Sequence, residues 1–317
     1  MSADSQLSAD LKPSIGDAAA RVRGVVALDE PMARHCTWRA GGRAACLFRP
    51  VDVDDLATFL AALPAEIPVA FIGLGSNLLV REGGFDGVLI ATNQALAEVR
   101  RATEDSFIAG AGVPCAKLAR EAARAGFADA AFLAGIPGTI GGALAQNAGA
   151  FGGDTWSHVE AVTTIDRSGA LHERMPSAFE VGYRSVSTPT ESWFVRGTFR
   201  FGPERHPEAE HRIRELIARR AASQPTGQAS CGSVFRNPEG DHAGRLIEAA
   251  GLKGRRIGGA VVSPEHANFI INDAKASAAD IEALMQTVAR EVASRFGVEL
   301  VPEVTVIGQH PQGADAR

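Results

Sequence analysis

The sequence predicts an α+β fold built from more than one domain. The chain has 317 residues, whereas a single domain usually spans about 100–200 residues. Short apolar runs broken by turns fill the first third of the chain, which is typical of small α+β units. Apolar residues at helical spacing mark the last third. A hydrophobic share of 45% and a charged share of 22% are those of an ordinary globular protein.

The first half of the chain begins with residues 1–21, which we expect to form a mobile tail because they are polar and alanine-rich. The segment 50–63 then predicts a capped helix between strands. A second helix is expected to start at Pro114 and to stop at Gly126. Strands are expected at the apolar runs 69–74, 78–80, 88–90 and 107–109.

The second half opens with the segment 134–154, which is too rich in glycine for a continuous helix or strand. Strand-like runs return over 159–201, and a polar linker near 203 leads to a basic helix at 211–222. A helix at 278–296 has a capping-box start at Ser277 and Asp280. Its apolar stripe, which we interpret as core packing, is Ile281, Leu284, Met285, Val288, Val292 and Phe296.

Composition excludes several classes of protein. A net charge of −5 gives no support to a polyanion-binding role. Four scattered cysteines, without a CxxC pair or a histidine at zinc-finger spacing, predict reduced, buried thiols and no metal site. The N-terminus lacks a signal-peptide pattern, and the longest uncharged stretch contains proline and glycine. We therefore expect a cytoplasmic protein without nucleic-acid or membrane partners, and we separately expect a monomer.

The first chemical motif is the loop Gly73-Leu74-Gly75-Ser76-Asn77. It is not a Rossmann fingerprint, because Leu78 stands where the third glycine is required. Its glycines, serine and asparagine can still present hydrogen-bond donors to a phosphate. A simple tight turn is the alternative reading.

The second motif is the glycine cluster at 135–142, which can turn tightly and then open a helix. N–H groups at a helix start can bind an anion, and glycines let a ligand approach closely. The alternative is a packed crossover. Two such segments in one chain suggest a dinucleotide, and no P-loop lysine, HExxH or GxSxG motif competes with that reading. The candidate residues here are Gly138, Thr139, Gly142 and Gly149.

Three further residues are candidates for chemistry. Arg184, in a turn after Tyr183, can pair with a carboxylate or a phosphate, although exposed arginines are common. Ser233 lies beside Gly232, where a serine is more often a turn or cap residue. Glu303 is a carboxylate in an apolar tail and therefore a candidate for a perturbed pKa.

Together these motifs resemble the UDP-N-acetylenolpyruvoylglucosamine reductase family, and the resemblance runs from about residue 22 to 308. The matching segments are TWRAGGRA (37–44), GLGSNLL (73–79), AGIPGTIGGALAQNAGAFGGD (134–154), GYR (182–184), GSVFRNP (232–238), HANFIIN (266–272) and PEV (302–304). The resemblance implies an FAD-binding fold of the vanillyl-alcohol-oxidase type. It implies α+β FAD-binding subdomains at 22–92, to which 297–308 returns, and at 93–210. An α+β substrate domain at 211–296 and a tail at 309–317 complete the expected organisation.

The resemblance also implies an activity, which is the NADPH-dependent reduction of UDP-N-acetylglucosamine enolpyruvate to UDP-N-acetylmuramate in peptidoglycan synthesis. Non-covalent FAD would be held by the loop Gly73, Gly75, Ser76 and Asn77 and by Gly138, Thr139, Gly142 and Gly149. Arg184 and Glu303 would stabilise an enolate-like intermediate, and Ser233 would protonate it. Tyr183, Arg236 and Asn237 would bind the substrate.

This chain departs from the family pattern in three places. Eight residues separate Arg184 from Trp193, so the tyrosine-bearing loop of one branch is absent and that branch's uridine contacts cannot be transferred. Arg236 replaces a frequent lysine, and Cys231 stands where a small residue is usual. Oxidases of this fold type that attach their flavin covalently often use a histidine after a pair of glycines. Because Arg43 follows Gly41-Gly42 in this chain, the resemblance favours non-covalent flavin.

Two rival functions remain at this point. One is an FAD-dependent oxidase or dehydrogenase of the same fold acting on a small alcohol or hydroxy acid. The other is a flavin-binding protein without turnover, in which replacing Ser233 would change nothing measurable.

Overall fold

The computed structural model describes residues 13–202 and 205–311. Helices and strands are mixed along the chain, which confirms the predicted α+β class. The chain divides into two compact units. Unit 1 comprises Met1–Leu28, Ala45–Leu74 and Asp86–Arg219, and unit 2 comprises Asp29–Ala44, Gly75–Phe85 and Arg220–Arg317.

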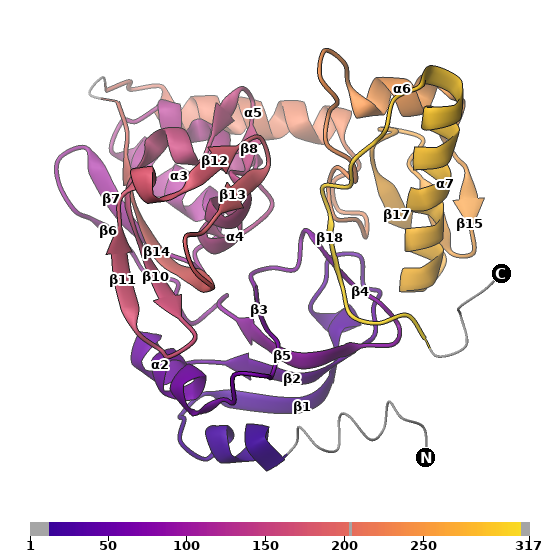
Figure 1. The fold of residues 1–317 in the computed structure, drawn as a ribbon. Helices are drawn as coiled ribbons and strands as arrows, with labels where there is room; N and C mark the ends of the chain where they lie inside the picture. Colours follow the sequence, from indigo (N-terminus) through magenta and orange to yellow (C-terminus); the bar gives the residue numbers. More distant parts are fainter. Residues whose placement is uncertain (1–12, 203–204, 312–317) are drawn as a thin grey trace. The chain divides into compact units, whose positions relative to one another are not determined.

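Unit 1 contains most of a four-stranded sheet ordered β1-β2-β5-β3 (Figure 1). Helix α2 (Val53–Ala62) begins after Asp52, whose side chain accepts a hydrogen bond from the Asp55 N–H, as the expected cap requires. Phe59 of α2 stacks on Phe48 of β2 inside a shared core, with ring centroids 4.1 Å apart. The strands are β1 (Val25–Pro31), β2 (Arg43–Arg49), β3 (Val69–Ile72) and β5 (Phe85–Ala91).

An antiparallel five-stranded sheet ordered β11-β10-β14-β7-β6 forms the rest of the strand framework of unit 1 (Figure 1). Helix α4 (Ile140–Gln146) packs against β14 and β7. The strand runs expected at 107–109 and over 159–201 are confirmed. The strands are β6 (Val99–Arg101), β7 (Ser106–Gly110), β10 (Val159–Asp166), β11 (Leu171–Arg174) and β14 (Ser192–Arg200).

The glycine-rich segment of unit 1 is broken into short pieces, as predicted. A 3-10 helix, η2 (Asp129–Gly135), precedes α4, and helix α3 (Cys115–Arg124) lies before it, between Pro114 and Gly126 as expected. Short hairpins and single 3-10 turns complete the unit. They are β8 (Gly149–Ala150) with β9 (Gly153–Asp154), β12 (Glu180–Gly182) with β13 (Ser185–Ser187), η3 (Trp156–His158) and η4 (Pro176–Ala178).

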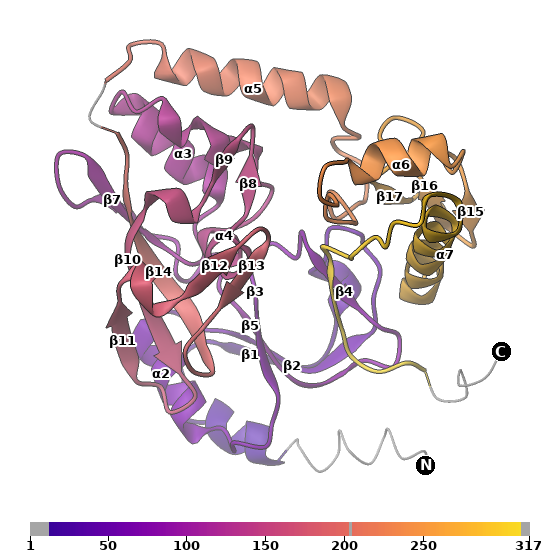
Figure 2. The same ribbon diagram turned by 45° about the horizontal axis from the view of Figure 1, so that its top comes forward.

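Unit 2 is built on a three-stranded sheet, β15 (Arg256–Ile257), β16 (Ala260–Val262) and β17 (Ile270–Asn272), against which α7 (Ala278–Phe296) packs (Figure 2). The predicted capping box between Ser277 and Asp280 is present. The remaining elements are η1 (Met32–Arg34), α6 (Ala243–Ala249) and the parallel pair of β4 (Leu78–Val80) and β18 (Thr305–Ile307). Helix α5 (Ala209–Ser223), the expected basic helix, contains the boundary between the units.

Two expectations from the sequence need correction. Residues 13–19, which fall in the expected mobile tail, form a helix because Ile15 and Ala18 bury their side chains completely in the core beside α2. Phe296 does not complete the buried stripe of α7 and is 40% exposed, because it is the last helical residue before the left-handed Gly297 cap. Residues 1–12 and 312–317 of the expected tails lie outside the described residues.

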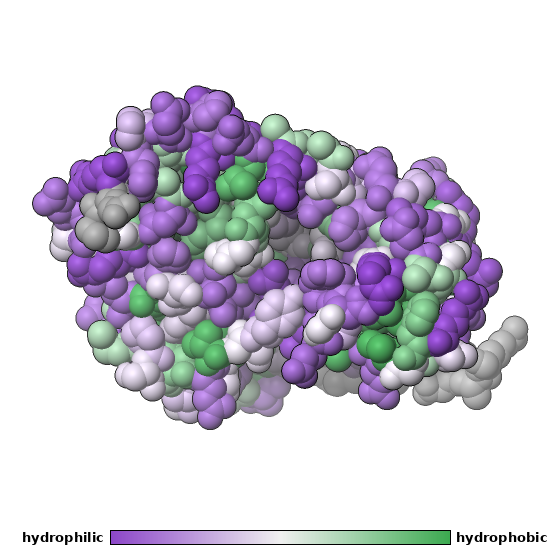
Figure 3. Space-filling model, turned by 90° about the horizontal axis from the view of Figure 1, so that it is seen from above, coloured by the Kyte–Doolittle hydropathy of each residue, from purple (hydrophilic) through white to green (hydrophobic). Residues whose placement is uncertain are grey.

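The burial of the cysteine side chains and the character of the surface can be compared with the sequence-based expectations. The four cysteines are buried and free, which confirms the prediction of reduced thiols. Hydrophilic residues cover most of the face seen in Figure 3, with smaller hydrophobic patches between them. Within residues 13–202 and 205–311, none of the helices is both long and apolar enough to span a membrane.

Candidate functional site

The loop after β3 is held in a conformation that only glycine adopts easily. Gly75 has φ +63°, and a Cβ atom there would lie 1.9 Å from the carbonyl oxygen of His35. The Gly75 carbonyl accepts a hydrogen bond from the Thr37 N–H at 3.0 Å. The loop is therefore packed against the TWRAGG segment, with no room for any side chain at this position.

Gly73 brings the first motif against the second within unit 1. A Cβ atom on Gly73 would lie 2.3 Å from Thr139 Oγ1. Thr139 is only 2% exposed, and its Oγ1 has no hydrogen-bond partner among the described residues. Because a buried hydroxyl without a partner is costly, this atom suits a bound polar ligand. The residues of both expected flavin segments therefore fit a cofactor at this point.

One expected anion site in unit 1 is not available. The helix start after Thr139 was expected to offer free N–H groups. The N–H groups of Ile140 and Gly141 instead donate to the carbonyls of Val113 and Ala111, both at 2.8 Å. This part of the motif is a packed crossover, which was the alternative interpretation.

Arg184 lies in the tight turn between β12 and β13, in the left-handed region with φ +54°. Its Nη2 donates to the Gly149 carbonyl at 2.9 Å and its Nη1 to the Asn147 carbonyl at 3.3 Å. The guanidinium group is therefore held against the second glycine segment, within unit 1. Tyr183 is 56% exposed, and its ring lies 5.3 Å from Arg184 Cζ.

Asn147 ties the same turn to the glycine segment from the other side. It caps α4 in the left-handed conformation and is 8% exposed. Its Oδ1 accepts from the Trp156 N–H at 3.0 Å, and its Nδ2 donates to the Gly182 carbonyl at 3.3 Å. Sequence analysis missed this positioning role. The left-handed cap after a glycine-containing helix is the signal that could have indicated it.

Unit 2 places the segments of Ser233 and Glu303 side by side. The Glu303 N–H donates to the Val234 carbonyl at 2.8 Å, and Phe235 forms an antiparallel bridge with Pro302. Asn77 joins them, because its Nδ2 donates to the Glu303 carbonyl at 3.0 Å. Three predicted residues from distant parts of the sequence, Asn77, Ser233 and Glu303, therefore lie on one connected strip.

The predicted substrate residues after Ser233 differ in what they offer. Arg236 carries a buried Nε atom that has no hydrogen-bond partner in the part of the chain the structure describes. Such an atom suits an anionic ligand group. Asn237 is exposed, and its Oδ1 already accepts from the Ala243 N–H at 3.1 Å, at the start of α6. Its amide oxygen is therefore structural.

Cys231 belongs to the packing under this strip. Its Sγ lies 3.3 Å from Thr37 Oγ1, which donates to the Ser230 carbonyl at 2.6 Å. Burial raises the pKa of the Cys231 thiol, and the hydrogen bond with Thr37 opposes that shift only in part. The thiol is therefore protonated at neutral pH and acts as a small apolar side chain.

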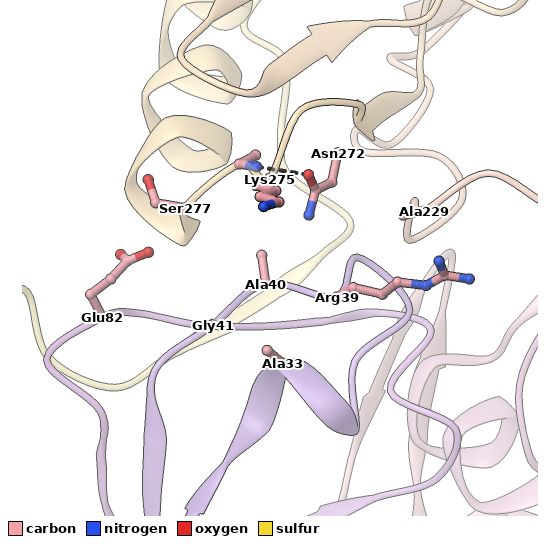
Figure 4. A pocket seen from close by; sticks show the side chains of 10 residues that line it. Ala33, Arg39, Ala40, Gly41, Glu82, Ala229, Asn272, Lys275 and Ser277 are labelled. Atoms are coloured by element: carbon pink, nitrogen blue, oxygen red, sulfur yellow. Dashed lines mark hydrogen bonds between the residues drawn. The ribbon is translucent and has the colours of Figure 1, made fainter.

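A separate pocket of about 500 Å³ lies in unit 2 and contains none of the predicted site residues (Figure 4). Asn272 joins two of its walls, because its Nδ2 donates to the Trp38 carbonyl at 2.8 Å and its Oδ1 accepts from the Ala276 N–H at 2.7 Å. Glu82 accepts from the first N–H groups of α7. Both side chains therefore bond to backbone groups, which indicates a structural role for them. Among the described residues no cluster of three or more His, Cys, Asp or Glu side chains could hold a metal ion.

Comparisons with known proteins find both family models and similar sequences. Residues 224–307 match the model described as UDP-N-acetylenolpyruvoylglucosamine reductase, C-terminal domain, and residues 44–174 match an FAD binding domain. A UDP-N-acetylenolpyruvoylglucosamine reductase of Alkalilimnicola ehrlichii is 55% identical over 88% of this chain and 94% of its own length. One of Nitrosomonas eutropha is 49% identical over 94% of this chain and 93% of its own.

A solved structure is also similar. The crystal structure of UDP-N-acetylenolpyruvylglucosamine reductase from Thermus caldophilus superimposes with a TM-score of 0.74 at 33% sequence identity. The match covers 90% of this chain and 98% of that one.

Proposed function

The chain belongs to the UDP-N-acetylenolpyruvoylglucosamine reductase family, and from this premise we propose how its own residues carry out the reaction. It is an FAD-dependent oxidoreductase that reduces UDP-N-acetylenolpyruvoylglucosamine with NADPH in peptidoglycan synthesis. The observation that carries the assignment of roles is the pairing of the Ser233 segment with the Glu303 segment, next to Asn77.

The cofactor would be held by the two glycine segments. Gly73, Gly75, Ser76 and Asn77 form the first, and Gly138, Thr139, Gly142 and Gly149 the second. The unpartnered Thr139 hydroxyl and the tight Gly73 contact support this assignment. When bound there, FAD would supply the hydride-transfer chemistry between NADPH and the methylene carbon of the enolpyruvyl group. The protein supplies the orientation and the proton.

Arg184 and Glu303 act on the substrate carboxylate. Negative charge grows on this group as hydride adds to the double bond, and a cation fixed beforehand stabilises that charge most in the transition state. The two carbonyl contacts of Arg184 keep its guanidinium in place before substrate arrives. Glu303 would act either protonated or sharing a proton, because a carboxylate without a proton cannot donate a hydrogen bond to an anion.

Ser233 donates the proton that completes the reduction. After hydride addition at the methylene carbon, the neighbouring ether-bearing carbon must gain a proton, and the Ser233 hydroxyl delivers it. No hydrogen bond joins the Ser233 side chain to another residue of the described chain, so its hydroxyl is available to substrate. Arg236, through its buried Nε, together with Tyr183 and Asn237, contacts the rest of the substrate.

The setting of the reaction is also part of the proposal. Four free, buried cysteines suit a reducing compartment, which supports the cytoplasm. We assign NADPH and the enolpyruvyl nucleotide sugar as the reaction partners of a monomer.

The test separates the two half-reactions of the Ser233→Ala variant in anaerobic stopped-flow experiments. NADPH should bleach the flavin at the wild-type rate, whereas reoxidation by the enolpyruvyl substrate should slow by about 100-fold or more, as expected for one lost general acid. Ser230→Ala is the matched control and should resemble wild type in both steps. Equal slowing of both half-reactions by Ser233→Ala would contradict the assigned role. Wild-type flavin that a small alcohol reduces, and that the enolpyruvyl substrate cannot reoxidise, would favour the oxidase alternative.

A further inference from the structure

Asn268 makes an unusual set of contacts with the residues that follow Ser233. Its side chain closes a two-bond ring with the backbone of Phe235: Oδ1 accepts from the Phe235 N–H at 3.0 Å, and Nδ2 donates to the Phe235 carbonyl at 2.8 Å. Its own carbonyl accepts from the Val234 N–H at 2.8 Å. Asn268 is 4% exposed, so these bonds are shielded from water. One residue therefore satisfies three backbone groups directly after Ser233.

The geometry of the neighbouring bridge explains why a side chain is needed there. In the bridge between Phe235 and Pro302, the hydrogen bonds come from the flanking residues, with Glu303 N–H to the Val234 carbonyl and Arg236 N–H to the Val301 carbonyl. The backbone groups of Phe235 itself then point to the opposite edge. Within residues 13–202 and 205–311 no strand pairs with that edge, and the Asn268 amide takes the place of one. Without it, two buried backbone groups would lose their partners.

The Val234–Phe235 segment is consequently held on both edges. Residues 301–303 bind one edge and Asn268 binds the other, so a shift of the segment would break hydrogen bonds on both edges. Asn268 is itself anchored, because its N–H donates to His266 Nδ1 at 3.2 Å. Ser233 is covalently attached to this clamped segment, and all of these residues belong to unit 2.

We infer that Asn268 is a positioning residue for proton delivery, acting through Ser233 by fixing the backbone that carries it. This inference rests on the role proposed above for Ser233. Among the described residues the hydrogen bonds of Asn268 go only to Val234, Phe235 and His266, so its loss should leave the NADPH step intact. Because a displacement of about 1 Å at a reacting group can slow a reaction about 100-fold, the loss should appear in reoxidation by substrate.

The experiment uses the full-length FAD holoenzyme and measures both half-reactions of Asn268→Ala per bound flavin. Reduction by NADPH should stay within about two-fold of wild type, and reoxidation by the enolpyruvyl substrate should slow about 10–100-fold. The matched control is Asn272→Ala. It removes another side-chain amide with two hydrogen bonds from the segment 266–272, but these bonds go to Trp38 and Ala276 and not to the backbone after Ser233. It should keep the wild-type reoxidation rate. Equal slowing in Asn272→Ala would overturn the inference.

A double variant tests whether Asn268 acts through Ser233. If it does, Asn268→Ala should cause little further slowing in the Ser233→Ala background, because the group that it positions is already gone. A persistent factor of ten or more would show that Asn268 acts independently and would overturn the inference. If Ser233→Ala alone fails to slow reoxidation, the proposed role of Ser233 fails first, and the two failures are thereby distinguished.

A second variant keeps the inference testable if Asn268→Ala does not fold. Asn268→Asp preserves the size of the side chain and the acceptor for the Phe235 N–H, but the ionised carboxylate cannot donate to the Phe235 carbonyl. Its reoxidation rate should recover as the pH falls and the carboxyl regains a proton to donate. A loss that does not change with pH relative to wild type would contradict the proposed clamp.

Discussion

Replacing Gly75 with alanine tests whether the first glycine loop is fixed by its backbone. An L-residue at φ +63° carries a penalty of about 1–2 kcal/mol. The new Cβ would also lie 1.9 Å from the His35 carbonyl oxygen, so the loop must move by about 1 Å or more to reach normal contact. That movement strains the packing by about 1–3 kcal/mol and weakens the bond from the Thr37 N–H by about 1 kcal/mol. Together we expect a loss of about 3–6 kcal/mol in the free energy of unfolding.

Gly251→Ala separates the backbone penalty from the clash. Gly251 has φ +71°, but a Cβ atom there would meet nothing within 4 Å. It should therefore lose only about 1–2 kcal/mol. Both variants would be unfolded in urea as apoproteins, and their flavin content would be measured by absorbance after purification. Gly251→Ala should keep its flavin and Gly75→Ala should lose most of it. Equal destabilisation of the two variants, with equal flavin content, would refute the reasoning.

Two further predictions concern buried groups to which we assign no part in the reaction. Asp55→Ala should lower the free energy of unfolding in urea by about 2–4 kcal/mol, because the Asp55 carboxylate accepts from the N–H groups of residues 23, 24 and 51 at 2.7, 2.9 and 3.0 Å. The control Asp54→Ala, at the exposed neighbouring residue, should change that free energy by only about 0.5 kcal/mol. Equal losses in the two variants would contradict this explanation. The second prediction concerns the thiols: burial raises the pKa of Cys36, Cys46 and Cys115 to about 12, against an ordinary value of 9.0. All four thiols should therefore resist a thiol-reactive disulfide at pH 8 until urea is added, and rapid labelling of the native protein would contradict their burial. The free energy of unfolding should also fall as the pH rises from about 9 toward 12, because in that range the thiols ionise readily only in the unfolded chain.

Much of the fold could be predicted because its signals are local. The start of α7 was predicted to the residue, since a capping box and a helical stripe both occur within one segment. The N-terminal helix at 13–19 was missed for the opposite reason. Its alanine-rich composition resembles a tail, and only the burial of Ile15 and Ala18 against distant residues of the chain makes it part of the core.

In the site, likewise, the residue types could be predicted from the sequence, whereas their hydrogen-bond partners could not. Glycines and charged residues could be read from motifs, because turns and charge pairing need particular residue types. The N–H groups after Thr139 were predicted to be free and are not, since their partners Val113 and Ala111 lie more than twenty-five residues earlier in the chain. A helix start indicates donors, but only the tertiary structure determines whether a backbone carbonyl already occupies them.

Asn268 shows why connections of this kind leave no trace in a single sequence. Its role depends on the phase of the bridge between Phe235 and Pro302, since a shift by one residue would turn the Phe235 backbone groups toward residues 301–303 instead. That phase is set by pairings between segments more than sixty residues apart, and no periodic pattern of side chains records it. An asparagine in a turn before a strand therefore looks like any other turn residue. The difference is that two buried backbone groups next to Ser233, the proposed proton donor, have no other hydrogen-bond partner among the described residues, which is why we propose that this amide serves the site and not only the turn.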